Sequence, residues 1–197
     1  MKHLRKWAIG AVAAAACLTA TSSIAASIKI TFTNSQASEG LYLTPFFSTV
    51  HDGTFDIFDP NTRASDELEA LAEDGNPAPL VGAATDAGFA AQVAFGPGVP
   101  PVLAPGESAT VTFNGIDRLT DRFLSFASMV IPSNDIFLGN PDPIQLFDDT
   151  GAFSATAPIV LTSAQAWDGG TEANNNRGAA FNAAGGTAFD TDARIRL

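Results

Sequence analysis

The sequence predicts an all-β domain, an antiparallel β-sandwich with one short helix in a connecting segment. Short segments that alternate apolar and polar residues recur along the chain, and Gly, Pro and Asn residues separate them. Only one segment shows the apolar spacing and the capping residues of a helix. The chain has no internal repeat and no long linker, so we expect a single domain over residues 26–197.

Residues 1–25 have the three-part order of a secretory signal peptide. Basic residues come first, an apolar run follows, and small residues close the segment in "TSSIAA". We expect cleavage after Ala25, which places the mature protein outside the cytoplasm, either secreted or periplasmic. An uncleaved anchor helix is one alternative, but the apolar run is short for a bilayer. Lipoprotein processing at Cys17 is another, although Ala14 stands where such sites carry a bulky aliphatic residue.

Removal of the signal leaves an acidic chain without cysteine. About 170 residues remain, enough for one domain with its own core. Seven basic residues stand against twenty-one acidic ones, a net charge of −14. Such a surface repels phosphate backbones, so we expect no nucleic-acid partner, and it repels anionic membranes unless a cation bridges them. Without cysteine the mature chain has no disulfide, no thiolate zinc site and no cysteine nucleophile.

The predicted strands differ in how much of each is apolar. Residues 27–33 direct Ile28, Ile30 and Phe32 to one face and polar residues to the other. In the aromatic segment 41–50, a proline indicates an edge or a break. The segment "RFLSFASMVI" is almost continuously apolar, which predicts the central strand. Further strands are predicted within residues 53–59, 88–96, 100–115, 157–170 and 192–197.

The predicted helix lies in "ASDELEALAEDGN". Ser65 caps its start, and Leu68, Leu71 and Ala72 form its apolar face. Acidic residues fill the first turn, where the helix dipole favours anions, and Gly75 ends the helix. This placement indicates a short solvated helix rather than carboxylates that bind a ligand.

The common catalytic motifs are missing from the sequence. There is no Gly-x-Ser-x-Gly elbow, phosphate loop or dinucleotide fingerprint. His51 is the only histidine of the predicted mature chain, and in "TVHDGTF" it has the setting of a turn or surface residue. A hydrolase that uses Asp or Glu carboxylates stays as the alternative function. Trp167, the one tryptophan after the signal, gives little aromatic surface for a sugar cleft.

Three carboxylates follow two predicted strands. Asp135 comes just after the central strand, and Asp168 and Glu172 lie in "WDGGTE" after another. If the two strands are neighbours, both loops open at one end and the three acids converge. Calcium prefers such hard oxygen ligands from flexible loops, and the two glycines let the backbone turn tightly. Acids in Gly/Asn-rich loops are also common turn residues, so the pattern alone leaves both interpretations open.

Three motifs in this order resemble the spondin N-terminal domain family. They are "ASDELEALAEDGNPAPL", "SFASMVIPSNDIFLG" and "WDGGTEANN", and the resemblance covers roughly residues 28–175. It implies a C2-like antiparallel β-sandwich with bound calcium. The acidic ligands of the family fall here on Asp135, Asp168 and Glu172. The family commonly has Asp at the position of Glu172, and the extra methylene changes the distance to an ion.

The resemblance also implies a role in binding or adhesion without catalysis. The partner is then an extracellular protein, a glycan or another surface ligand. We expect Trp167 to pack beneath the loop as a structural anchor. A third function, calcium-bridged membrane contact, requires Ile136, Phe137 and Leu138 to lie exposed at a loop tip.

Overall fold

The structure is a computed structural model that describes residues 25–155, 158–175, 177, 179 and 188–197. The predicted signal peptide lies outside this range except for Ala25, which begins the first strand. Much of the Asn/Gly-rich segment before residue 188 also lies outside it. Within the described residues, no helix is long and apolar enough to cross a membrane.

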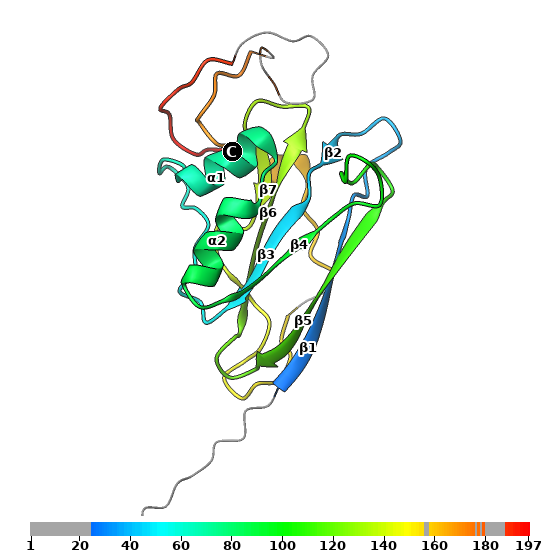
Figure 1. Cartoon of the computed structure of the whole chain (residues 1–197), viewed down its shortest axis with the longest axis vertical. Helices are drawn as coiled ribbons and strands as arrows, with labels where there is room; N and C mark the ends of the chain where they lie inside the picture. The colour runs from blue at the N-terminus through cyan, green and yellow to red at the C-terminus, as the bar shows by residue number, and fades with distance from the viewer. Residues whose placement is uncertain (1–24, 156–157, 176, 178, 180–187) are drawn as a thin grey trace, which may run out of the picture.

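Two antiparallel sheets form the sandwich (Figure 1). The smaller sheet pairs β1 (Ala25–Thr33) with β5 (Ser108–Asp117). The larger sheet has the order β4-β3-β6-β7-β9, and β2 and β8 also pair with β6. Its strands are β2 (Tyr42–Leu43), β3 (Phe46–His51), β4 (Ala90–Ala94), β6 (Phe123–Ile131), β7 (Ile136–Gly139), β8 (Ile144–Gln145) and β9 (Ala166–Asp168). The predicted all-β class is therefore confirmed.

The helices α1 (Asp66–Asp74) and α2 (Ala78–Asp86) cover the face of the larger sheet that lies away from β1 and β5 (Figure 1). One apolar core fills the space between the two sheets, with Phe32 stacked on Phe46 at a ring distance of 4.3 Å. A second core lies between the helices and the larger sheet, where Leu68 and Leu71 contact the strands. The molecule thus has three layers, with the larger sheet in the middle.

Strand β6 is the centre of this arrangement. Leu124, Phe126 and Val130 point into the core between the sheets, and Ala127 points into the core under the helices. Because both faces of β6 are buried, its sequence is almost continuously apolar rather than alternating. The predicted central strand is confirmed.

Helix α1 follows the prediction closely. The Ser65 side chain accepts a hydrogen bond from the backbone of Leu68, and Gly75 adopts the left-handed conformation that ends the helix. The prediction of one helix was incomplete, because α2 follows directly. Its sequence, APLVGAATD, consists mainly of small residues and carries a weak apolar stripe, so periodicity did not reveal it.

Three predicted strands were wrong or only partly right. Residues 53–59 form a loop, in which Ile57 and Phe58 are buried without a partner strand. Residues 192–197 make only an isolated bridge between Arg196 and Asp168, and Leu197 is exposed. The prediction over residues 157–170 is described by the structure from residue 158 onward, and within that range only β9, near the end of the segment, is a strand. In the segments 53–59 and 192–197, the buried apolar residues that suggested strands are covered by packing of a loop and do not belong to a paired strand.

Candidate functional site

The pairing of β7 with β9 brings the two predicted loops together. Ile136 lies opposite Asp168, so the residues just outside this pair, Asp135 and Gly169, are neighbours. The backbone N–H of Gly169 donates to the carbonyl oxygen of Asp135 at 3.0 Å. Gly170 has φ +73°, and a Cβ there would lie 2.9 Å from the backbone of Ala193, so this turn requires glycine.

Asp135 is fully buried at the centre of the site. Its Oδ2 accepts hydrogen bonds from the backbone N–H groups of Thr171 and Glu172, at 2.8 and 3.0 Å, and from the Thr171 hydroxyl at 3.3 Å. Its Oδ1 is also buried and has no hydrogen-bond partner among the described residues. Burial, with the nearby charge of Asp168, raises the pKa of Asp135 above its ordinary value, against the lowering effect of the hydrogen bonds.

Asp168 is fully engaged by the protein. Its Oδ1 accepts from the backbone N–H of Gly170 at 2.8 Å. Its Oδ2 accepts from the Asn174 amide at 2.6 Å and from Arg196, through Nη2 at 3.0 Å and Nε at 3.2 Å. Asp168 therefore already has a positively charged partner, whereas Asp135 has none among the residues that the structure describes.

Glu172 lies between Asn134 and further acids. The Asn134 amide donates to its Oε2 at 3.1 Å and to the carbonyl of Arg177 at 2.9 Å. Burial first, and then the charges of Asp135, Asp190 and Asp74, raise the pKa of Glu172, although the Asn134 hydrogen bond lowers it.

Glu73, on the last turn of α1, belongs to the same group and was not predicted. Burial raises its pKa to about 7, and the charges of Glu172, Glu69 and Asp135 add to this effect, against a hydrogen bond from Thr171. The only sequence signal was that Glu69 and Glu73 stand one turn apart beside the apolar stripe of the helix.

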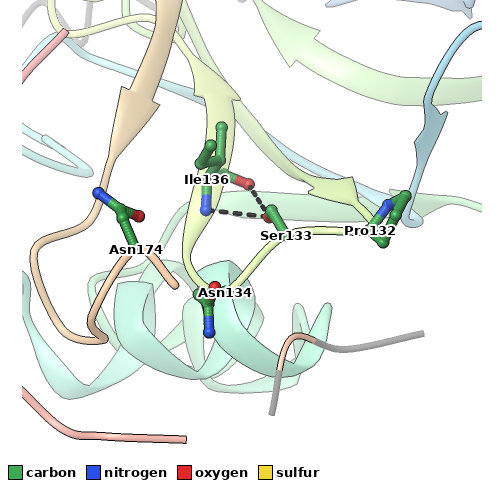
Figure 2. Close-up of a pocket in the computed structure, with 5 residues that line it drawn as sticks. All are labelled: Pro132, Ser133, Asn134, Ile136 and Asn174. Carbon is green, nitrogen blue, oxygen red and sulfur yellow. Dashed lines mark hydrogen bonds between the residues drawn. The ribbon is translucent and has the colours of Figure 1, made fainter. Parts of the chain in front are cut away.

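Figure 2 shows an open pocket, and two residues that line it, Asn134 and Asn174, donate hydrogen bonds to Glu172 and Asp168. The Ser133 hydroxyl accepts from the backbone N–H of Ile136 at 3.1 Å, which closes the turn between β6 and β7. The pocket walls carry both asparagines that donate to the acids, and the residues around it are Pro132, Ser133, Asn134, Ile136 and Asn174. The pocket and the acidic group thus share one surface at this end of the sandwich.

The residues fit a hard cation in chemistry, because the buried Oδ1 of Asp135 is a carboxyl oxygen with no hydrogen-bond partner among the described residues. The loops of Asp135, Asp168 and Glu172 do meet, as predicted. As they stand, however, no three Asp, Glu, His or Cys side chains of the described residues are grouped closely enough to hold an ion.

Other predicted features of this region are buried as structural elements. Trp167 is 8% exposed and packs edge-on against Phe58 at 5.1 Å, which confirms its anchoring role. Phe137 is fully buried, and Ile136 and Leu138 are partly buried in strand β7. They do not form the exposed loop tip that membrane contact requires.

His51 was predicted as a turn or surface residue. It does precede a bend of the chain, but the expectation of a surface position was wrong. It is fully buried at the end of β3, where Phe55, Phe89 and Phe123 surround its ring. Its Nδ1 accepts from the backbone N–H of Gly53 at 3.1 Å, so the ring proton is on Nε2, which donates to the Ser125 hydroxyl at 3.0 Å.

This Ser–His pair does not have the arrangement of a hydrolase. A catalytic triad needs an Nδ1–H that donates to a carboxylate, and here Nδ1 is an acceptor. The adjacent Asp52 instead accepts from the backbone and hydroxyl of Thr54. Burial lowers the pKa of His51, although the charge of Asp52 opposes this, so the ring is neutral at pH 7. Both ring nitrogens serve to hold the end of β3 in place.

By its fold and its acidic loops, the protein belongs to the class of β-sandwich domains that carry a polar site in the loops at one end. The family model Spondin_N matches residues 31–184. The chain therefore belongs to the spondin N-terminal domain family, which confirms the resemblance in its motifs. No curated protein gave a significant match to the chain. The family is generally non-enzymatic and typically extracellular.

Proposed function

We propose that this protein is a non-catalytic, calcium-binding domain that acts outside the cytoplasm in binding or adhesion. The observation that carries the proposal is the Oδ1 of Asp135, a buried carboxylate oxygen without a partner. A buried anion without a counter-charge costs free energy of folding, and the natural compensation is a cation. Family membership, which predicts an extracellular and non-enzymatic domain, agrees with this function.

Asp135, Asp168 and Glu172 would hold the ion. Bound calcium would supply the positive charge that Asp135 and Glu172, unlike Asp168, do not receive from any described residue. Asp135 already organises the loop, because its other oxygen binds the backbone of Thr171 and Glu172. Asn134 orients Glu172, and Glu73 adds negative charge from α1. The open pocket beside these residues is where an extracellular protein, a glycan or another surface ligand would contact the domain.

Thermal unfolding in EDTA and in millimolar calcium tests the proposal. We expect calcium to raise the melting temperature by about 5 to 10 °C if its concentration is roughly a hundred times the Kd. Asp135→Asn should lose this increase, because it removes the buried negative charge. Asp86→Asn is the matched control, since Asp86 ends α2, is exposed and carries the same charge.

The two variants separate ion binding at the site from a general effect on an acidic protein. An equal increase in the Asp135→Asn and Asp86→Asn variants would place calcium elsewhere. No increase in the unmodified protein, with no calcium found by elemental analysis, would refute calcium binding and leave Asp168 and Glu172 as turn residues.

A further inference from the structure

The C-terminal segment, residues 189–196, forms backbone hydrogen bonds with residues 168–173, the loop that carries Asp168 and Glu172. Asp168 and Arg196 exchange backbone hydrogen bonds of 2.8 and 3.1 Å. Ala193 N–H donates to the Gly170 carbonyl at 2.9 Å, and Thr191 N–H donates to the Thr171 carbonyl at 2.6 Å. This segment lies beyond residues 31–184, which the family model matches.

Backbone hydrogen bonds and one buried side chain hold the segment in place, but another of its side chains is exposed. Ile195 is fully buried under the helices, and its N–H donates to the Thr62 carbonyl at 2.8 Å. By contrast, the Arg196 side chain is 58% exposed. It folds back onto Asp168 from a backbone that stays in place, so it can leave Asp168 without unfolding the segment.

Arg196 occupies the oxygen that a cation would need. Its Nη2 and Nε both donate to Oδ2 of Asp168, at 3.0 and 3.2 Å, and the Asn174 amide reaches the same atom. The other oxygen, Oδ1, is held by the backbone of Gly170. A second positive charge binds Oδ2 less favourably beside the guanidinium, because the two cations repel each other and compete for the same lone pairs.

We propose that Arg196 is a built-in competitor of calcium for Asp168. The guanidinium neutralises Asp168 when no ion is bound and turns into solvent when one binds, while the backbone of residues 189–196 keeps its pairing. The C-terminal segment thereby lowers the calcium affinity of the site. This inference rests on the proposed calcium function and assigns it a regulator within the same chain.

Calcium titration by calorimetry tests the competition, with charge-matched variants. We expect Arg196→Gln to bind calcium about threefold to tenfold more tightly than the unmodified protein. Arg194→Gln is the control, because it removes the same charge two residues away, where the side chain donates to the Asn61 carbonyl and contacts no acid of the site. It should change the Kd less than about twofold, through long-range charge alone. Arg196→Lys keeps the charge and should fall between the two.

The outcomes separate this inference from the function on which it rests. If the unmodified protein binds calcium and Arg196→Gln binds with the affinity of Arg194→Gln, the competition is refuted while the calcium function stands. Weaker binding by Arg196→Gln also refutes it, and would make Arg196 a residue that positions Asp168. If neither the unmodified protein nor Arg196→Gln binds, the calcium function itself fails. Binding by Arg196→Gln alone supports the competition in its strongest form.

A second readout follows the guanidinium directly. In NMR spectra, the Arg196 Nε–H signal should shift on calcium addition and exchange faster with water, because it loses its carboxylate partner. The Arg194 side-chain signal should stay in place. An Arg196 signal that is unchanged at saturating calcium would overturn the proposal even if the affinities agreed with it.

Discussion

Two buried ionisable groups lie at opposite ends of the central strand β6, and the protein satisfies them very differently. His51 pairs with Phe123 at the start of β6, and Asp135 lies just after the end of the same strand. Both side chains are fully buried. His51 uses both ring nitrogens in hydrogen bonds. Asp135 uses one carboxylate oxygen in three hydrogen bonds and leaves the other without any.

The difference indicates which end is structural and which end awaits a ligand. A buried polar group costs little once its hydrogen bonds are complete, so His51 needs nothing from outside the chain. A buried charge with an unpartnered oxygen is costly, so Asp135 lowers its free energy when a cation binds. Burial alone therefore does not identify a site, because His51 is as buried as Asp135. What identifies the site is the carboxyl oxygen of Asp135 that has no hydrogen-bond partner among the described residues.

The largest change in the free energy of unfolding should follow removal of His51, the buried group whose hydrogen bonds are complete. His51→Ala deletes a ring packed against three phenylalanines and leaves the Ser125 hydroxyl without its donor. We expect a loss of about 3 kcal/mol in the free energy of unfolding, measured by urea denaturation. The loss should be the same in EDTA and in calcium. A loss that calcium restores would mean that the two ends are coupled, and the comparison would break.

The next effect is the pH dependence of the metal-free protein, to which the two ends contribute with opposite signs. The pKa of His51 is lowered in the fold, so the unfolded chain binds more protons and stability falls as the pH drops below about 6.5. The pKa of Glu73 is raised to about 7, so its contribution is complete below about 4.5 and is lost as the pH rises through 7. Asp135 and Glu172, whose pKa values are also raised, act in the direction of Glu73.

We therefore expect the metal-free protein to be most stable at mildly acidic pH and to lose about 1 kcal/mol between roughly pH 5.5 and 8, a value discounted for the partial exposure of Glu73. Urea midpoints at several pH values measure this loss. Glu73→Gln should flatten the alkaline side only, and calcium should do the same by compensating the ionised acids. An alkaline loss that persists unchanged in Glu73→Gln would show that Glu73 does not contribute to it.

The sequence predicts the acidic end better than the histidine end, for a physical reason. Asp135, Asp168 and Glu172 lie in short loops next to strands that pair directly, so their proximity follows once β7 and β9 are neighbours. The burial of His51 depends on Phe89, which comes from a distant part of the chain. No local pattern carries that information, and "HDG" has the composition of a turn.

The same limit explains what was missed at the acidic end. Arg196 reaches Asp168 because the C-terminal segment returns to the loop, and this return is fixed by the burial of Ile195 rather than by any motif. Glu73 joins the acids because α1 packs over the end of the sheet. The strand predicted over residues 192–197 failed for a related reason, since one buried residue, Ile195, satisfies the apolar requirement without a continuous ladder.

The smallest changes in the free energy of unfolding should come from removing one hydroxyl beside His51 and one beside Asp135. Ser125→Ala removes the acceptor of the His51 Nε2–H and leaves a buried donor unsatisfied, which should cost about 1 to 1.5 kcal/mol with or without calcium. Of the contacts to Asp135, Thr171→Val removes only the one at 3.3 Å, because Oδ2 keeps both backbone N–H donors. It also removes the Thr171 hydrogen bond that lowers the pKa of Glu73. It should cost about 0.5 kcal/mol in EDTA, because the hydrogen bond lost is long and weak. Urea denaturation of both variants in EDTA measures the two costs. If Thr171→Val cost more than Ser125→Ala, Asp135 would depend on every donor it has, and its free oxygen would reflect a carboxylate held rigidly by the fold rather than one that awaits an ion.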